Sequence, residues 1–371
     1  MASRILITGG AGFIGSHLAD SLLRRGYKVR ALDNLSPQVH GAGAKRPRYL
    51  DPDVELIEGD VRDPDTVREA LRDVDGVFHL AAMVGVGQSM YELAKYTAAN
   101  NLGTAVLLEA LIEHPVERLV VASSMSIYGE GLYRTRSGRL VNYAARSLEQ
   151  LRHGRWEPRT SDGDRLTPVP TPETKAPTLA SVYALSKYDQ ERMCLITGSA
   201  YGIPTVALRF FNAYGPRQAL SNPYTGVLAI FAARLLNGNP PLIFEDGEQK
   251  RDFVSVHDVA DGCRLAYETP SAAGQVFNIG SGRARTINEI AQKLAEQLGK
   301  DIEPEITGKY RVGDIRHCFA DISRARRVLG YDPKVELDDG ILELAGWLEG
   351  QIAKDRVVEM RRALEQRGLT V

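Results

Sequence analysis

The chain has 371 residues, of which 25% are charged, and its formal net charge at pH 7 is −1. This length suffices for about two folding units around a buried core. The near-neutral charge gives no electrostatic case for binding nucleic acid or an anionic membrane. Cys194, Cys263 and Cys318 have no paired spacing, so neither a disulfide framework nor a metal site is expected. No signal peptide or membrane-spanning run is recognisable, and a cytoplasmic protein is expected.

The first sixty residues have the order of elements typical of a dinucleotide-binding fold. An apolar strand over 4–8 is followed by a glycine-rich loop, a helix over 17–25 and a strand over 28–32 that ends at Asp33. Loop residues predicted to contact the cofactor are Gly9, Gly12, Phe13, Ile14 and Gly15. The glycines let the backbone approach a pyrophosphate, whose charge the helix N-terminus favours. Asp33 would bind ribose hydroxyls and repel a 2′-phosphate, which predicts NAD rather than NADP.

Strands and helices go on alternating to about residue 211, which predicts an α/β fold with a doubly wound, Rossmann-like parallel sheet. Further strands are expected at 54–57, 76–82, 118–122 and 205–211, and helices at 97–113 and about 179–200. Asp60 follows the 54–57 strand, where it would meet the adenine amino group or serve as a turn or N-cap residue. The predicted organisation is an NAD-binding domain over 1–212, a mainly substrate-binding lobe over 213–350 that is partly interleaved, and a C-terminal helix over 351–371, packed on the surface or a partner.

Residues 130–176 interrupt this alternation with a stretch rich in arginine, glycine and proline, and one helical segment is expected at about 143–153. Its arginines are Arg134, Arg136, Arg139, Arg146, Arg152, Arg155, Arg159 and Arg165. They could bind phosphate, but a solvated surface with scattered ion pairs is favoured. The insert is expected to cover the mouth of the active site or to contact another subunit.

Two Tyr-x-x-x-Lys patterns compete for a catalytic role, Tyr183 with Lys187 and Tyr91 with Lys95. Side chains four apart share one helix face, and a close cation favours the phenolate, which is a credible general base. Ser124 ends a strand upstream of Tyr183 and offers a hydroxyl partner, whereas Tyr91 lies in a loop without one. We therefore assign the catalytic role to Tyr183.

Several ordered motifs between residue 4 and about 345 resemble the extended short-chain dehydrogenase/reductases, specifically the NAD-dependent nucleotide-sugar epimerase/dehydratase family. They are Thr8–Gly15, Asp60–Val61, Leu80–Ala82, Asn100–Thr104, Ser123–Ser124 with Ile127–Gly129, Tyr183 with Lys187, and Arg209–Arg217. The resemblance implies further cofactor contacts by Asn34, Asp60, Val61, Leu80, Ala81, Ala82, Asn100, Tyr183 and Lys187. For a nucleotide-diphosphate sugar it implies contacts by Met83, Ser124, Ser126, Tyr183, Asn212, Arg251, Arg311 and Asp314. It also implies a homodimer formed through the helices at 98–113 and 179–200.

The resemblance implies that Tyr183 removes a sugar hydroxyl proton while NAD⁺ takes hydride from the same carbon. Lys187 would hold the nicotinamide ribose and lower the pKa of Tyr183, and Ser124 would bond the reacting oxygen. Dehydratases of the family carry an Asp-Glu pair after this serine, and decarboxylases usually keep the glutamate. This chain has Met125 and Ser126 there, so epimerisation is favoured over elimination.

Within the family, residues 35–41, 126–131, the arginine-rich insert and residues 218–226 most resemble dTDP-L-rhamnose 4-epimerases. Such an enzyme interconverts dTDP-L-rhamnose and dTDP-6-deoxy-L-talose. A UDP-glucose/UDP-galactose 4-epimerase and a nucleotide-sugar decarboxylase or reductase remain alternatives. A non-enzymatic NAD-binding scaffold is the alternative from another class, and the intact Ser124, Tyr183 and Lys187 argue against it.

Overall fold

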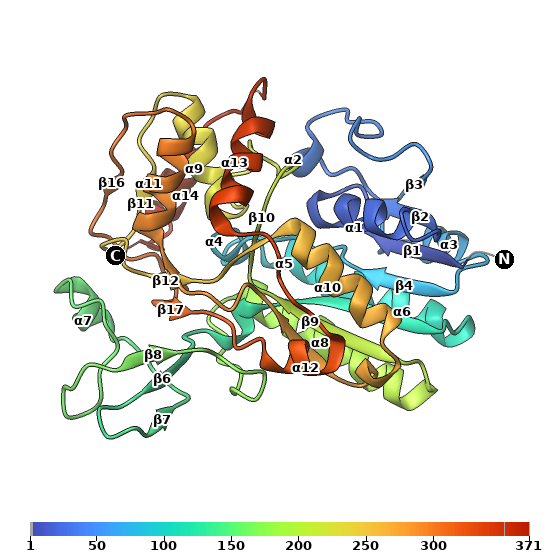
Figure 1. The fold of residues 1–371 in the computed structure, drawn as a ribbon, viewed down its shortest axis with the longest axis horizontal. Coiled ribbons are helices and arrows are strands. Elements are labelled where there is room, and N and C mark those ends of the chain that lie inside the picture. Colours follow the sequence, from blue (N-terminus) through green and yellow to red (C-terminus); the bar gives the residue numbers. More distant parts are fainter. Residues whose placement is uncertain (1–2, 352, 371) are drawn as a thin grey trace.

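The computed structural model describes residues 3–351 and 353–370, and a seven-stranded parallel sheet forms its centre (Figure 1). Its strands are apolar runs with little contact with solvent; the last six residues of β5, for example, are all buried, as expected for a parallel sheet covered on both faces. In spatial order the strands are β14 (Val276–Ile279), β9 (Thr205–Phe210), β5 (Arg118–Ser124), β4 (Gly76–His79), β1 (Arg4–Thr8), β2 (Lys28–Asp33) and β3 (Glu55–Glu58).

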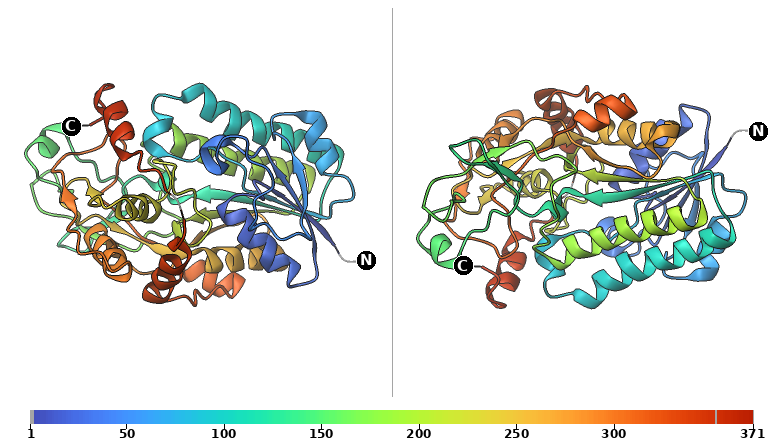
Figure 2. Two further views of the ribbon diagram at one scale, coloured as in Figure 1. Left: turned by 90° about the horizontal axis from the view of Figure 1, so that it is seen from above. Right: turned by 90° about the horizontal axis from the view of Figure 1, so that it is seen from below.

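Helices cover both faces of this sheet, and Figure 2 shows the two layers from above and below. One layer contains α3 (Pro64–Ala70), α6 (Gly103–Glu113) and α8 (Val182–Tyr201). The other contains α1 (Phe13–Leu23), α10 (Val256–Glu268) and α12 (Ser323–Leu329). The doubly wound, Rossmann-like fold predicted from the sequence is thereby confirmed.

The order of the strands reverses at β1, which pairs with β2 on one side and with β4 on the other. The chain leaves β1 first toward β3 and later toward β14, so the loops after β1 and β4 diverge. Such a switch point at the carboxyl ends of the strands is where open α/β sheets bind ligands.

A smaller lobe stands beside those carboxyl ends, at the left of Figure 1. Its helices are α9 (Val227–Leu236), α11 (Ile287–Gln297), α13 (Leu337–Leu348) and α14 (Val357–Glu365). Its short strands are β10 (Asn212–Tyr214), β11 (Leu242–Ile243), β12 (Lys250–Arg251), β13 (Phe253–Ser255), β15 (Arg285–Thr286), β16 (Glu305–Ile306) and β17 (His317–Cys318). The chain returns from this lobe to the main sheet at β14, so the two parts interleave.

The arginine-rich insert forms a separate three-stranded sheet and one short helix. The elements are β6 (Leu132–Arg134), β7 (Leu140–Val141), β8 (Thr167–Val169) and α7 (Leu148–Arg152). The helix predicted over 143–153 is shorter because Ser147 caps it, with its Oγ accepting from the Gln150 amide at 3.1 Å, and Gly154 follows it. Glycine at +64° in φ ends the segment, a conformation that other residues rarely adopt.

Several other helices differ from the predicted ranges. The helix predicted at 97–113 begins as a π-helical turn, η1 (Thr97–Leu102), before α6. Ser181 caps α8 through the Ala184 amide, so this helix starts three residues later than predicted. The remaining short elements are α2 (Pro37–His40), α4 (Val86–Ser89), α5 (Leu93–Tyr96), η2 (Met125–Tyr128) and η3 (Pro270–Ala272). No helix in the described ranges combines the length and apolar character needed to span a membrane.

Candidate active site

A cleft of about 1000 Å³ opens between the carboxyl ends of the sheet strands and the smaller lobe. With one exception, every residue predicted to contact cofactor or substrate lines this cleft. The exception is Asn100, which is fully buried behind the wall. Its Oδ1 accepts from the Met83 amide at 2.7 Å, and its Nδ2 donates to the Met83 carbonyl at 3.1 Å. Asn100 therefore holds Met83, which does line the cleft, and its predicted contact with the cofactor is not reproduced.

The glycine loop forms a wall of bare backbone at one end of the cleft. Gly9 has φ +71°, and a Cβ added to Gly15 would lie 2.3 Å from the Gly9 carbonyl oxygen. No side chain fits between the loop and α1, so the backbone can approach a ligand closely. Gly12 is the N-cap of α1 and offers no side chain to bond the first helical amides. A pyrophosphate fits this helix N-terminus in charge and in space.

Two carboxylates stand near this loop. Asp33 ends β2, and its oxygens accept from the Ala11 amide at 3.1 Å and the Leu35 amide at 3.0 Å. Asp60 accepts from Arg62 and Asn34, and the hydrogen bonds from Arg62 lower the pKa of Asp60 to about 2. Asp60 is not an N-cap, since Asp63 caps α3. An aspartate at the end of β2 fits ribose hydroxyls and disfavours a 2′-phosphate.

Ser124 and Tyr183 meet in the middle of the cleft. Ser124 is the last residue of β5, and Tyr183 lies in the first turn of α8. Ser124 is close enough to Tyr183 to lower the pKa of its phenol against the effect of burial, and the Tyr183 amide donates to Ser89 Oγ at 3.0 Å. Ser126 Oγ donates to Ser124 Oγ at 2.9 Å. The structure therefore brings together the hydroxyl groups that the sequence predicted to act on the substrate.

The competing Tyr91 is not among the residues that line the cleft. Its hydroxyl is bonded to that of Tyr224, and the guanidinium of Arg367 lies 4.4 Å from the centre of its ring. These contacts pack Tyr91 against the C-terminal segment. The geometry thus favours Tyr183 over Tyr91 for chemistry on a bound ligand.

Lys187 is not among the groups that shift the pKa of Tyr183 in this structure. Burial raises the pKa of Tyr183, and the hydrogen bond with Ser124 opposes this shift. The Lys187 ammonium instead donates to Gln190 Oε1 at 2.7 Å, and burial lowers the pKa of Lys187 to about 8. Gln190 was missed in the sequence, although it lies three residues from Lys187 and therefore on the same helix face.

The other half of the cleft carries groups suited to an anion. Asn212 Oδ1 is buried without a hydrogen-bond partner in the described part of the chain. The Arg251 guanidinium donates to backbone carbonyls, among them that of Arg316 at 2.9 Å, and forms no ion pair within residues 3–351 and 353–370. Arg311 pairs with Asp314 through two bonds of 3.0 and 2.8 Å. A buried guanidinium that lacks a carboxylate partner is a strong candidate for binding phosphate oxygens.

The C-terminal segment also contributes to the cleft, which the sequence did not predict. Val357 and Met360 of α14 line it, and Leu364 packs with them against Leu242 and Phe244. The Val312 amide donates to the Leu369 carbonyl at 2.9 Å, so the tail also holds the loop that carries Arg311. The apolar spacing of three and four residues in α14 was the available signal.

A model of the NAD dependent epimerase/dehydratase family matches residues 5–147 and 161–280. The dTDP-L-rhamnose 4-epimerase of Burkholderia thailandensis is 36% identical over 358 residues, which cover 94% of this chain and 96% of that protein.

Two solved structures are similar along almost their whole length. The UDP-glucose 4-epimerase of Thermotoga maritima with UDP-glucose is 33% identical, has a TM-score of 0.76, and covers 94% of this chain and 99% of its own. The UDP-glucose 4-epimerase of Thermus thermophilus in complex with NAD is 32% identical, has a TM-score of 0.74, and covers 94% of this chain and 100% of its own. The chain therefore belongs to the NAD-dependent epimerase/dehydratase family, and its cofactor is NAD.

Proposed function

We propose that the protein is a nucleotide-sugar 4-epimerase that interconverts dTDP-L-rhamnose and dTDP-6-deoxy-L-talose. The observation that carries the reaction type is the set of carboxylates in the cleft. Among the described residues that line it, these are Asp33, Asp60 and Asp314. Asp33 and Asp60 stand at the cofactor end, and Asp314 is paired with Arg311. An elimination therefore lacks a carboxyl group beside the reacting sugar.

The two residues after Ser124 strengthen this reading. Met125 is buried in the hydrophobic core, and the Ser126 hydroxyl is bonded to Ser124. Neither can act as the acid or base of a dehydratase. Oxidation at carbon 4 followed by reduction on the other face needs only one group that moves a proton, and Tyr183 is the candidate.

In the proposed mechanism, bound NAD supplies a reversible hydride acceptor. Tyr183 Oη takes the proton of the sugar 4-hydroxyl, and the bond with Ser124 orients both hydroxyl groups. The buried Lys187 supplies positive charge near the cofactor ribose and favours ionisation of Tyr183 once Lys187 is turned from Gln190. Arg251, Asn212 and Arg311 bind the diphosphate, so that the 4-ketone can turn over without leaving the cleft.

The choice of dTDP-L-rhamnose is supported by the similarity to the Burkholderia thailandensis protein and by the apolar side chains of Val357 and Met360 in the cleft. A second candidate, UDP-glucose 4-epimerisation, is favoured by the similarity to the Thermotoga maritima enzyme with UDP-glucose. The homodimer is also proposed, because α8 exposes Leu185 and Ile196 on its outer face and unpaired apolar side chains favour a covered interface.

Proton NMR on the purified enzyme tests this function. The enzyme is incubated with dTDP-L-rhamnose and, separately, with UDP-galactose, without added reductant. A new anomeric signal from dTDP-L-rhamnose alone, with no loss of NAD, is the expected result. Conversion of UDP-galactose alone would replace the substrate and keep the mechanism. Tyr183→Phe should retain NAD and lose turnover, and full activity of this variant would refute the assigned base.

A further inference from the structure

One arginine of the insert differs from the other seven. Arg134, Arg136, Arg139, Arg152, Arg155, Arg159 and Arg165 are exposed, as expected for a solvated surface. The Arg146 side chain is only 3% exposed. A long cationic side chain is rarely buried unless it is paired, so Arg146 is expected to have charged partners.

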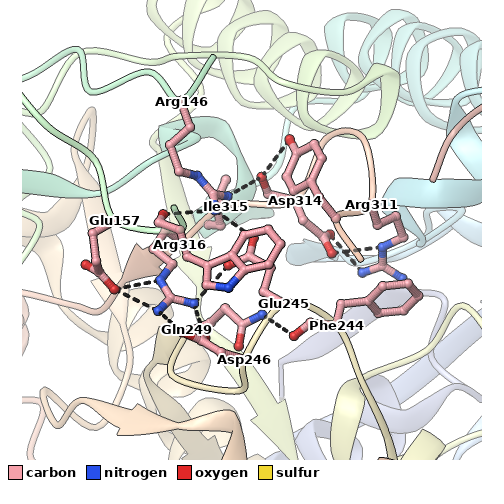
Figure 3. Close-up of polar contacts among 12 residues, drawn as sticks. Arg146, Glu157, Phe244, Glu245, Asp246, Gln249, Arg311, Asp314, Ile315 and Arg316 are labelled. Atoms are coloured by element: carbon pink, nitrogen blue, oxygen red, sulfur yellow. Dashed lines mark hydrogen bonds and ion pairs between the residues drawn. The ribbon is translucent and has the colours of Figure 1, made fainter. Parts of the chain in front are cut away.

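These partners come from the smaller lobe and from the start of the insert, and Figure 3 shows two of them, Glu245 and Asp314. Arg146 Nε donates to Glu130 Oε1 at 3.1 Å, and its Nη1 donates to Glu245 Oε1 at 2.7 Å. Its Nη2 donates to the Asp314 carbonyl at 3.3 Å, and its guanidinium lies 5.2 Å from the centre of the Tyr310 ring. Arg146 therefore bridges the insert to the loop that carries Arg311 and Asp314.

A second buried arginine extends the bridge. Arg316 is 1% exposed, and its Nη2 donates to Glu157 Oε1 of the insert at 2.7 Å. Its Nη1 donates to Glu245 Oε2 at 2.9 Å and to Asp246 Oδ1 at 2.6 Å. Glu157 lies between the two stretches that the family model matches, so this contact comes from a part of the insert outside the shared pattern.

The two arginines and their carboxylates, Glu130, Glu157, Glu245 and Asp246, are here called the insert clamp. The clamp fixes the backbone on which Arg251 rests. The Arg316 amide donates to Glu130 Oε1 at 2.8 Å. In the same segment, the Ile315 and Arg316 carbonyls accept from the Arg251 guanidinium.

Three of the five N–H groups of Arg251 are used by carbonyls, those of Lys250, Ile315 and Arg316. Two therefore remain for a ligand. The nearby negative charges of Asp314, Glu130 and Glu245 support the charge of Arg251 against its burial. The insert clamp thus orients the Arg251 guanidinium, which lines the cleft, and its carboxylates help to keep that guanidinium charged.

We propose that the insert is a positioning element for the substrate's diphosphate, in which Arg146 and Glu157 hold segment 314–316 and thereby aim Arg251. This inference rests on the proposed function, because it takes a nucleoside diphosphate as the ligand. Arg146 and Glu157 are positioning residues, since neither is among the residues that line the cleft.

The test compares Arg146→Met, Arg146→Lys and Glu157→Gln with Arg155→Met, which removes an exposed arginine of the same insert. Arg146→Met is expected to raise KM for the nucleotide sugar and Kd for dTDP or UDP about tenfold, which equals about 1.4 kcal/mol. The kcat and the NAD content of Arg146→Met should stay near those of the wild type. Arg155→Met should match the wild type in KM, Kd, kcat and NAD content. Arg146→Lys should restore part of the affinity because it keeps the charge. Melting temperatures identify an unfolded variant, and Glu157→Gln then provides the same readouts with a smaller change in shape.

A double-mutant cycle decides whether the clamp acts through Arg251. The Arg146→Met/Arg251→Met protein should bind dTDP about as weakly as Arg251→Met alone, because residues that act through one another are not additive. The inference would be overturned if the double variant lost dTDP affinity by the product of the two single losses. It would also be overturned if Arg146→Met lowered kcat without a change in affinity. Titration with dTDP and UDP needs no turnover. If the wild type binds neither nucleotide, both the proposed function and the positioning role of the insert are refuted. If the wild type binds and Arg146→Met binds equally well, only the positioning role is refuted.

Discussion

Replacing Lys187 by methionine is expected to stabilise the NAD-free protein while it abolishes turnover. The Lys187 side chain is 3% exposed, and its hydrogen bond goes to the neutral Gln190 Oε1 at 2.7 Å. Burial lowers the pKa of Lys187 from 10.5 to about 8, and the nearby carboxylate of Glu191 opposes this only in part. At neutral pH the folded chain therefore holds a buried ammonium group at a cost in stability.

The size of the effect follows from the two pKa values. A fall from 10.5 to about 8 corresponds to about 3 kcal/mol, at about 1.4 kcal/mol for each tenfold change in proton affinity. Methionine removes this cost and fills a similar volume. It also leaves Gln190 Oε1 without its donor, which costs about 1–3 kcal/mol. The expected net gain at pH 7 is about 1 kcal/mol.

The pH dependence gives the prediction a second readout. Below pH 8 Lys187 is protonated in both the folded and the unfolded chain, so the whole cost is present. Between about pH 8 and 10.5 the folded wild type releases this proton while the unfolded chain keeps it, and the wild type gains stability. The advantage of Lys187→Met should therefore shrink between pH 7 and pH 9.5.

Urea unfolding of the NAD-free proteins at these two pH values measures the difference. Lys28→Met is the matched control because Lys28 is exposed, and it should match the wild type at both values. A Lys187→Met protein that is less stable than the wild type at pH 7, or whose advantage grows with pH, would refute the reasoning. Retained turnover would remove Lys187 from the mechanism.

Two further predictions concern the two ends of the cleft. Gly15→Ala should lower the melting temperature and lose NAD, since its Cβ would lie 2.3 Å from the Gly9 carbonyl oxygen; Gly12→Ala, with 3.3 Å to the same atom, should melt near the wild type. Normal melting and full NAD content in Gly15→Ala would contradict this. Met360→Ala should raise KM for the nucleotide sugar several-fold, about 1 kcal/mol, with kcat unchanged, because Met360 lines the cleft. Val358→Ala, at an exposed position of the same helix, should change neither constant, and equal effects of the two substitutions would count against the role of α14.

The cofactor half of the cleft could be predicted from the sequence because its determinants are local. The glycine loop, Asp33 and the start of α1 lie within about thirty residues, and each follows from backbone geometry or strand and helix periodicity. Ser124 and Tyr183 were also predicted to meet, since both follow from where a parallel strand and a helix end. The direction of the Lys187 side chain was not predictable, because it depends on burial and on the competing acceptor Gln190.

The substrate half is encoded by contacts between residues far apart in the chain. Arg146 and Glu245 are 99 positions apart, and Arg316 and Glu157 are 159 apart. No spacing rule separates Arg146 from the seven exposed arginines around it, so composition favoured a solvated surface for all eight. The same holds for Asn100, which the family pattern assigned to the cofactor but which the fold uses to hold Met83.

This difference bears on how substrate choice can vary within one reaction type. In the proposed mechanism, Ser124 and Tyr183 act on one sugar hydroxyl. Asp33, Asp60 and Asp314 are hydrogen-bonded to other protein groups, so the proposed chemistry is proton transfer at that hydroxyl with hydride transfer to NAD, whichever sugar is bound. The residues that shape the other half, Arg146, Glu157, Val357 and Met360, come from the insert and the tail rather than from the sheet. A change in the insert or in the tail can therefore alter the affinity for the nucleotide without moving the strand ends that carry Ser124 and Asp33. Donor specificity should follow the insert and the tail, and the reaction type should follow β5 and α8.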